Sequence, residues 1–177
     1  MGIGILYGKL RHLEAMPPWQ AGSDMIETVT FEKTSYAPAP LKFEAGTPNI
    51  EGAIGLAEAV KYLEALGMSE VVSHEKALTK YAVERMQECK KITIHGCLDL
   101  SKKCGIIPFS VKGLSSHDVA LICDNYGIMI RSGYHCAQPL HQQVLKLQSS
   151  DRASFYIYNT QEEIDRFVEV LKEIDQL

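Results

Sequence analysis

Residues 131–139 read Arg131-Ser132-Gly133-Tyr134-His135-Cys136-Ala137-Gln138-Pro139, and the organisation of the chain follows from them. The apolar run at 127–130 predicts a short strand, and Ser132-Gly133 predicts the turn that ends this strand. Cys136 is therefore expected on a loop just past a strand, with His135 beside it and Arg131 shortly before it. Nearby positive charge raises the small thiolate fraction of a free cysteine. The spacing alone leaves two interpretations open, a reactive thiol or a small buried cysteine.

Residues 131–140 resemble the active-cysteine motif of the SufS-type (group II) cysteine desulfurases, which are pyridoxal-phosphate enzymes of the class V aminotransferase family. Several motifs in the same order are far more specific than one, so the chain is identified as a member of this family. The other similar segments are Gly2-Ile-Gly-Ile-Leu-Tyr-Gly-Lys9, Met16-Pro-Pro-Trp19, Phe43-Glu-Ala-Gly-Thr-Pro-Asn49, Arg152-Ala-Ser154 and Tyr158-Asn-Thr160.

The resemblance implies a role for each candidate site residue. Cys136 matches the nucleophile that takes sulfur from L-cysteine as a persulfide, which releases L-alanine and supplies iron–sulfur cluster assembly. Arg152 matches the residue that binds the substrate carboxylate, a task that suits a planar fork of donors. Without the match, a loose surface ion pair with Asp151 or with an acid on the last helix would be the simpler interpretation of Arg152. Arg131 is expected to orient the loop, and His135 has a supporting role at most, because adjacent residues on an extended chain point apart.

Gly46 and Thr47 match a segment that reaches the cofactor phosphate of the other subunit in the family. A helix N-terminus and a hydroxyl both favour a phosphate, while Thr47 equally suits the N-cap of its own helix, and both roles are compatible. The sequence departs from the family pattern at Tyr134, where a second histidine is common, and over residues 141–148.

The resemblance also implies that a large part of the enzyme lies outside this sequence. In the family, the lysine that binds the cofactor precedes the segment that resembles residues 2–8. We therefore expect the chain to be a C-terminal portion without the Schiff-base lysine, and not to bind pyridoxal phosphate alone. The implied partners are the N-terminal half of the enzyme, a sulfur-acceptor protein, L-cysteine and a second copy in a homodimer. The alternatives are a persulfide carrier or interaction module without cofactor chemistry, and a portion of a selenocysteine lyase.

Composition narrows the class of protein. The 177 residues are 46% hydrophobic and 23% charged, as in ordinary globular proteins, and the formal net charge of −4 argues against nucleic-acid binding. The sequence has no membrane-length apolar run and no signal-peptide pattern at its start. The five cysteines are odd in number and form no C-x-x-C pair, which favours reduced thiols in a cytoplasm and no metal site. The grouping of Cys97 and Cys104 with His95 is interpreted as incidental.

The pattern predicts an α+β fold, with a small, mostly antiparallel sheet and helices packed on one face. This agrees with the C-terminal domain of the fold-type I pyridoxal-phosphate enzymes. We expect residues 1–47 to be the tail of a large cofactor-binding domain, 48–67 a connecting helix and 68–177 the small domain. Expected strands lie at 2–8, 92–95, 104–111 and 152–157. Expected helices lie at 9–16, from Thr47 to Gly67, from Ser69, from Ser115 to Gly127, at 138–147 and after Thr160. The expected apolar faces include Val71, Leu78, Ala82 and Met86 in the helix from Ser69, Val119, Ile122, Cys123 and Tyr126 in the helix from Ser115, and Ile164, Phe167, Val168 and Leu171 in the last helix.

Overall fold

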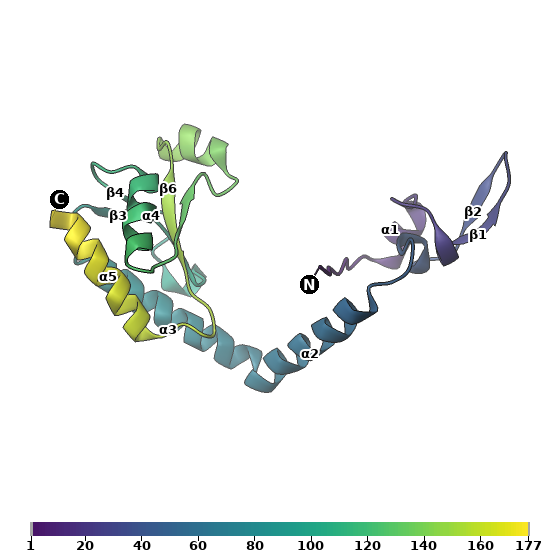
Figure 1. Ribbon diagram of the computed structural model, residues 1–177, viewed down its shortest axis with the longest axis horizontal. Helices are drawn as coiled ribbons and strands as arrows, with labels where there is room; N and C mark the ends of the chain where they lie inside the picture. Colours follow the sequence, from purple (N-terminus) through teal and green to yellow (C-terminus); the bar gives the residue numbers. More distant parts are fainter. Residues whose placement is uncertain (1, 177) are drawn as a thin grey trace. The chain divides into compact units, whose positions relative to one another are not determined.

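A four-stranded antiparallel sheet forms the centre of the second half of the chain in the computed structural model (Figure 1). The structure describes residues 2–176, which divide between Ala65 and Leu66 into two compact units. In the second unit the strands lie in the order β3-β4-β6-β5, and each pairs antiparallel with its neighbour. Their bounds are β3 (Ile92–Ile94), β4 (Ile106–Val111), β5 (Arg131–Gly133) and β6 (Ser150–Ser154).

Three helices cover one face of this sheet: α3 (Met68–Met86), α4 (Ser116–Asn125) and α5 (Gln161–Gln176). Successive side chains of a strand point to opposite faces, and Ile107, Phe109 and Val111 of β4 are the buried ones, on the helix side. Phe109 meets Phe167 of α5 edge to face, with ring centroids 5.9 Å apart. Full burial of each such side chain contributes about 1.5–3 kcal/mol. The predicted α+β class, with its antiparallel sheet and helices on one face, is confirmed.

The apolar faces predicted for α3 and α5 are also confirmed, since every side chain named for them is buried. In α4, Val119 and Cys123 are buried, but Tyr126 is exposed, because the helix ends at Asn125 and Tyr126 is its C-cap. The predicted caps form as well. The Ser115 hydroxyl accepts a hydrogen bond from the Asp118 amide at 3.2 Å, and the Thr160 amide donates to Glu163 Oε2 at 3.1 Å.

The prediction of a strand at 127–130 is wrong, because the strand lies directly after this run. The strand is Arg131–Gly133, so Ser132 and Gly133 belong to β5 and do not form the turn that ends it. Pairing with β6 decides this, because Arg131, Ser132 and Gly133 lie opposite Arg152, Asp151 and Ser150. Pairing across the sheet overrides local turn preference. For the same reason β6 begins two residues earlier than predicted. The helix expected at 138–147 is a shorter π-helical segment, Leu140–Leu145.

The first unit contains α1 (Leu10–Ala15), a hairpin of β1 (Ile26–Val29) and β2 (Thr34–Tyr36), and most of α2 (Ile50–Leu66). The strand predicted at 2–8 is wrong, because this segment pairs with no strand among residues 2–176. Thr47 does not cap α2 either. Instead, Oδ1 of Asn49 accepts a hydrogen bond from the Gly52 amide at 2.9 Å.

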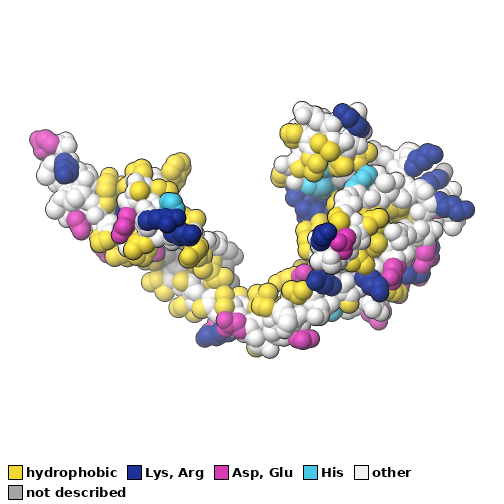
Figure 2. Space-filling model, turned by 180° about the vertical axis from the view of Figure 1, so that it is seen from behind, with side chains coloured by type: hydrophobic (Ala, Val, Ile, Leu, Met, Phe, Trp, Pro, Cys, Tyr) yellow, Lys and Arg dark blue, Asp and Glu magenta, His cyan; other side chains and the backbone are white. Residues whose placement is uncertain are grey.

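The first unit has almost no hydrophobic core of its own. Of its described residues, only Met25, Ala37 and Gly52 are buried. Large apolar side chains such as those of Tyr7, Trp19 and Phe31 are instead exposed. Figure 2 shows apolar side chains on the surface of this unit. No helix within residues 2–176 combines the length and apolar content that a membrane crossing requires.

Candidate active site

Two arginines lie side by side on the sheet face that the helices leave uncovered. In β6, Ala153 and Asp151 are buried on the helix side, so Ser150 and Arg152 point to the other face. Arg131 of β5 is the direct cross-strand partner of Arg152. Like charges directly opposite each other are destabilising. An anion bound near the pair would offset this repulsion.

The guanidinium of Arg152 has unused hydrogen-bonding capacity. Its Nε is buried and has no hydrogen-bond partner within residues 2–176, and among the same residues neither Arg152 nor Arg131 takes part in an ion pair. A buried donor without a partner costs about 1–3 kcal/mol. The surface ion pair with Asp151 is absent among these residues, because Asp151 points to the opposite face of the sheet.

Cys136 lies on a tight turn directly after β5. The Ala137 amide closes the turn with a hydrogen bond of 2.8 Å to the Tyr134 carbonyl. Both central residues are left-handed, with φ of 52° at His135 and 61° at Cys136. This conformation costs roughly 1–2 kcal/mol for each residue that has a Cβ. Cys136 is exposed, and Nη2 of Arg131 donates a hydrogen bond to its Sγ at 3.3 Å.

The other cysteines differ from Cys136 in their surroundings. Cys123 is fully buried, as predicted, and burial raises the pKa of its thiol to about 11. Burial also raises the pKa of Cys89. Cys97 and Cys104 are exposed. Among residues 2–176, no group of three or more His, Cys, Asp or Glu side chains is placed to hold a metal ion.

Replacing Arg131 by Ala is expected to slow alkylation of Cys136 at neutral pH by roughly three- to tenfold. A hydrogen bond from a cation stabilises a thiolate, which is the form that reacts. Iodoacetamide labelling with peptide mapping measures the rate, and Cys97 and Cys104 of the same chain serve as internal references. Equal rates at Cys136 in the variant and the unchanged chain would contradict this role.

His135 is held by β6 and does not point away from the site. Its Nε2 lies 3.1 Å from the Ser150 hydroxyl, while its Nδ1 is buried without a partner. The chain at His135 is left-handed, so the reasoning from an extended backbone does not apply there. Burial, followed by the charge of Arg152, holds the pKa of His135 below its usual value, so the ring is neutral at neutral pH.

Sequence reasoning missed two residues of the site, Ser150 and His141. Both are buried, and Nε2 of His141 lies 2.9 Å from the Ser150 hydroxyl. The position of Ser150, two residues before Arg152 in a strand, was a signal that both share a face. A cavity of about 260 Å³ adjoins these groups, and its lining includes His95, Pro108, His135, Leu140, His141 and Arg152.

The structure brings Arg131, His135, Cys136 and Arg152 together in the second unit. Gly46 and Thr47 lie in the first unit, where both are exposed. Gly46 has a φ of 83°, which favours glycine, and its amide donates to the Gly22 carbonyl at 3.3 Å.

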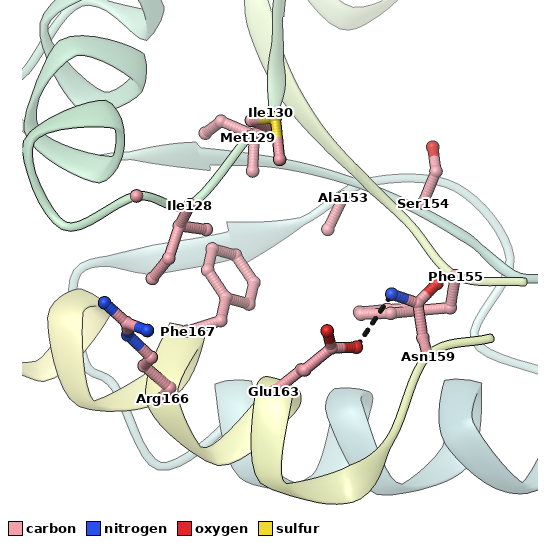
Figure 3. A pocket seen from close by; sticks show the side chains of 11 residues that line it. Ile128, Met129, Ile130, Ala153, Ser154, Phe155, Asn159, Glu163, Arg166 and Phe167 are labelled. Carbon is pink, nitrogen blue, oxygen red and sulfur yellow. Dashed lines mark hydrogen bonds between the residues drawn. The ribbon is translucent and has the colours of Figure 1, made fainter.

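A second pocket of the second unit, of about 200 Å³, lies between α5, β6 and residues 127–130 (Figure 3). Ile128, Ile130 and Phe167 line it. Its charged groups already have hydrogen-bond partners: Oε2 of Glu163 accepts from the side-chain Nδ2 of Asn159 at 2.9 Å, and Nη2 of Arg166 donates to the Tyr126 carbonyl at 2.6 Å. Both charged side chains of this pocket are therefore engaged in hydrogen bonds within the second unit.

The antiparallel α+β unit, with an exposed cysteine beside two arginines, belongs to a known class. The chain is a member of the class-V aminotransferase family, since the family model described as Aminotransferase class-V matches residues 1–167. Relatives and solved structures similar to this chain include proteins named as cysteine desulfurases.

Individual relatives agree with this assignment. The chain is 46% identical over 172 residues to a probable cysteine desulfurase of Staphylococcus epidermidis, an alignment that covers 97% of this chain and 41% of the relative. It is similar to the apo structure of the cysteine desulfurase from Thermococcus onnurineus NA1, with a TM-score of 0.90 and 38% identity over 96% of this chain and 42% of that one. It is also similar to the cysteine desulfurase CsdA of Escherichia coli in an S-sulfonic acid form, with a TM-score of 0.87 and 33% identity over 97% of this chain and 42% of that one. The chain thus spans about two fifths of the length of these relatives.

Proposed function

We propose that this chain is the C-terminal part of a SufS-type cysteine desulfurase and that Cys136 receives the sulfur of L-cysteine. The observation that carries the proposal is the exposed Cys136 thiol, 3.3 Å from the guanidinium of Arg131, which is itself the cross-strand partner of Arg152. The similarity to cysteine desulfurases over nearly the whole chain supports it.

Arg152 is proposed to bind the substrate carboxylate. Its half-buried guanidinium and partnerless Nε suit an anion with two oxygens in one plane. Cys136 Sγ then forms a sulfur–sulfur bond to the substrate while the carbon–sulfur bond of the substrate breaks. The substrate carbon gains the proton, so L-cysteine and the thiol become L-alanine and a persulfide on Cys136. Pyridoxal phosphate, when bound, supplies the electron sink for this chemistry.

Gly46 and Thr47 are proposed to contribute to the cofactor phosphate site. Because Asn49 caps α2, the Thr47 hydroxyl is not used for that purpose, and it has no hydrogen bond among residues 2–176. An exposed hydroxyl after a glycine with positive φ fits a phosphate. We expect the lysine that binds the cofactor to lie in the part of the enzyme that this chain does not span.

The proposed setting is iron–sulfur cluster assembly in a cytoplasm, with a sulfur-acceptor protein as partner. The location of Cys136 on an exposed turn supports a second protein as acceptor, because the persulfide must be reached from outside. The exposed apolar side chains of the first unit support association with the remaining part of the enzyme and with a second copy in a homodimer.

The test is reconstitution with the N-terminal portion of a close relative. Alanine release from L-cysteine is expected for the mixture and not for this chain alone. Cys136→Ala is expected to remove persulfide formation, and Arg152→Ala to raise KM for cysteine strongly, with Arg152→Lys recovering only part of the loss. Undiminished alanine release by the Cys136→Ala mixture, or tight binding of pyridoxal phosphate by the chain alone, would refute the proposal.

A persulfide carrier without cofactor chemistry is the second candidate. It is supported by the fact that Cys136 lies in a unit with its own hydrophobic core, unlike residues of the first unit. This candidate predicts that a sulfur donor such as polysulfide loads Cys136 in the chain alone and that an acceptor thiol then removes the sulfur. The reconstitution experiment separates the two, because a carrier gains no alanine release from the added portion. The same mixture assayed with selenocysteine and with cysteine distinguishes a selenocysteine lyase from a cysteine desulfurase.

A further inference from the structure

The hydroxyl of Ser150 joins two imidazole rings on the sheet face opposite helices α3, α4 and α5. Its Oγ lies 3.1 Å from Nε2 of His135 and 2.9 Å from Nε2 of His141. Ser150 is 1% exposed and His141 is 3% exposed, so water does not compete for these hydrogen bonds. The Tyr134 ring packs edge-on against His141, with centroids 6.0 Å apart, and restricts that ring further.

His141 also reaches the far side of the cysteine. Its Nδ1 lies 3.1 Å from the carbonyl oxygen of Ala137. Hydrogen bonds therefore run from His135 to Ser150, from Ser150 to His141 and from His141 to Ala137. The two ends of this path are the residues directly before and after Cys136.

Only one arrangement of protons satisfies the path when both rings are neutral. A carbonyl is only an acceptor, so Nδ1 of His141 carries the proton and its Nε2 accepts from Ser150. A hydroxyl has one proton, so Nε2 of His135 must donate to Ser150 Oγ. Burial lowers the pKa of His135, which favours the neutral form of that ring. Nδ1 of His135 then carries no proton, which agrees with the absence of a hydrogen-bond partner for this atom within residues 2–176.

We propose that Ser150 and His141 are positioning residues for Cys136. They hold the residues on either side of it and so maintain the left-handed turn in which the Cys136 thiol meets Arg131. Two neighbouring left-handed residues with a Cβ do not keep this conformation without support. The hydrogen bonds of Ser150 and His141 to the two flanking residues supply it. The inference rests on the proposed function only in taking Cys136 as the sulfur-accepting thiol.

The first measurement needs no variant. Nitrogen-15 NMR of the histidine rings in the full 177-residue chain is expected to give the Nε2–H tautomer for His135 and the Nδ1–H tautomer for His141. The opposite tautomer at either ring, or averaging between tautomers at His135, would refute the proposed positioning role of Ser150 and His141.

The second measurement is the alkylation rate of Cys136 in variants. Ser150→Ala is expected to slow it roughly three- to tenfold, because the turn loses the buried hydrogen bonds that hold it. Ser150→Thr keeps the hydroxyl and has the adjacent cavity of about 260 Å³ for its methyl group, so it is expected to restore the rate. The matched control is Ser154→Ala, an exposed serine of the same strand.

A double variant separates positioning from general loss of structure. If Ser150 acts through the contact between Arg131 and Cys136, Arg131→Ala combined with Ser150→Ala reacts no more slowly than Arg131→Ala alone. Independent effects that multiply, or a Ser150→Ala variant as fast as the unchanged chain, would refute the proposal. If Ser150→Ala fails to fold, the tautomers of the unchanged chain and the rate of Ser150→Thr decide. None of these measurements requires alanine release, so the result stands apart from the proposed desulfurase activity.

Discussion

Replacing Asp151 by Ala is expected to stabilise the second unit at alkaline pH by several kcal/mol. The Asp151 side chain is completely buried on the helix side of β6, and neither carboxyl oxygen has a hydrogen-bond partner within residues 2–176. Burial raises the pKa of this carboxyl from 3.8 to about 8. The folded chain therefore keeps Asp151 protonated in a pH range where the unfolded chain ionises it.

The direction of the pH effect follows from proton uptake. Below about pH 4 both states bind the proton, and Asp151 adds no pH dependence. Between about pH 4 and pH 8 the folded state binds one proton more than the unfolded state, so the free energy of unfolding falls by about 1.36 kcal/mol per pH unit. Above about pH 8 the loss is complete, on the order of 5 kcal/mol.

Urea unfolding at several pH values, followed by circular dichroism, measures this dependence. Asp151→Ala and Asp151→Asn are expected to lack the decline, while Asp124→Ala, an exposed carboxyl of α4, keeps it. Parallel stability curves for the Asp151→Ala variant and the unchanged chain would show that the carboxyl is not buried as described.

Replacing Cys136 by Gly is expected to abolish persulfide formation completely and yet make the chain more stable. Cys136 has a φ of 61°, a conformation that glycine adopts without the steric cost of a Cβ. The gain is about 1 kcal/mol, since glycine also has more freedom to lose on folding. Cys136→Ala removes the thiol but keeps the Cβ, so it is expected to show the same loss of persulfide without the gain.

The comparison of these two variants isolates the backbone from the sulfur chemistry. Thermal unfolding gives the stability difference, and cyanolysis of sulfur-loaded protein gives the persulfide. A Cys136→Gly variant no more stable than Cys136→Ala would mean that the turn is not strained at this residue.

The sequence was informative where local pattern and burial agree. Helix α5 is an example, because its capping residues Thr160 and Glu163 and its apolar face from Ile164 to Leu171 all favour the same helix. Segments whose structure depends on distant partners were predicted less well. Ser132 and Gly133 favour a turn locally but form a strand because β6 lies beside them. The segment at 2–8 has strand composition but pairs with no strand in the part of the chain that the structure describes.

The candidate site divides in the same way. The motif around Cys136 and the arginines at 131 and 152 could be named from sequence. Their proximity depends on the register of β5 with β6, which no short motif encodes. Ser150 and His141 were missed because their role arises only when the turn folds back onto β6, and Asp151 was missed as a buried acid because charged residues are rarely buried without a partner.

The opposite orientations of Asp151 and Arg152 make β6 sensitive to changes in chain length. Loss of a single residue from this strand would carry the guanidinium into the hydrophobic interior and the acid out beside the remaining arginine. Point changes to the surrounding surface leave that arrangement intact. We therefore expect natural variants to carry many substitutions around β6 and almost no deletions within it.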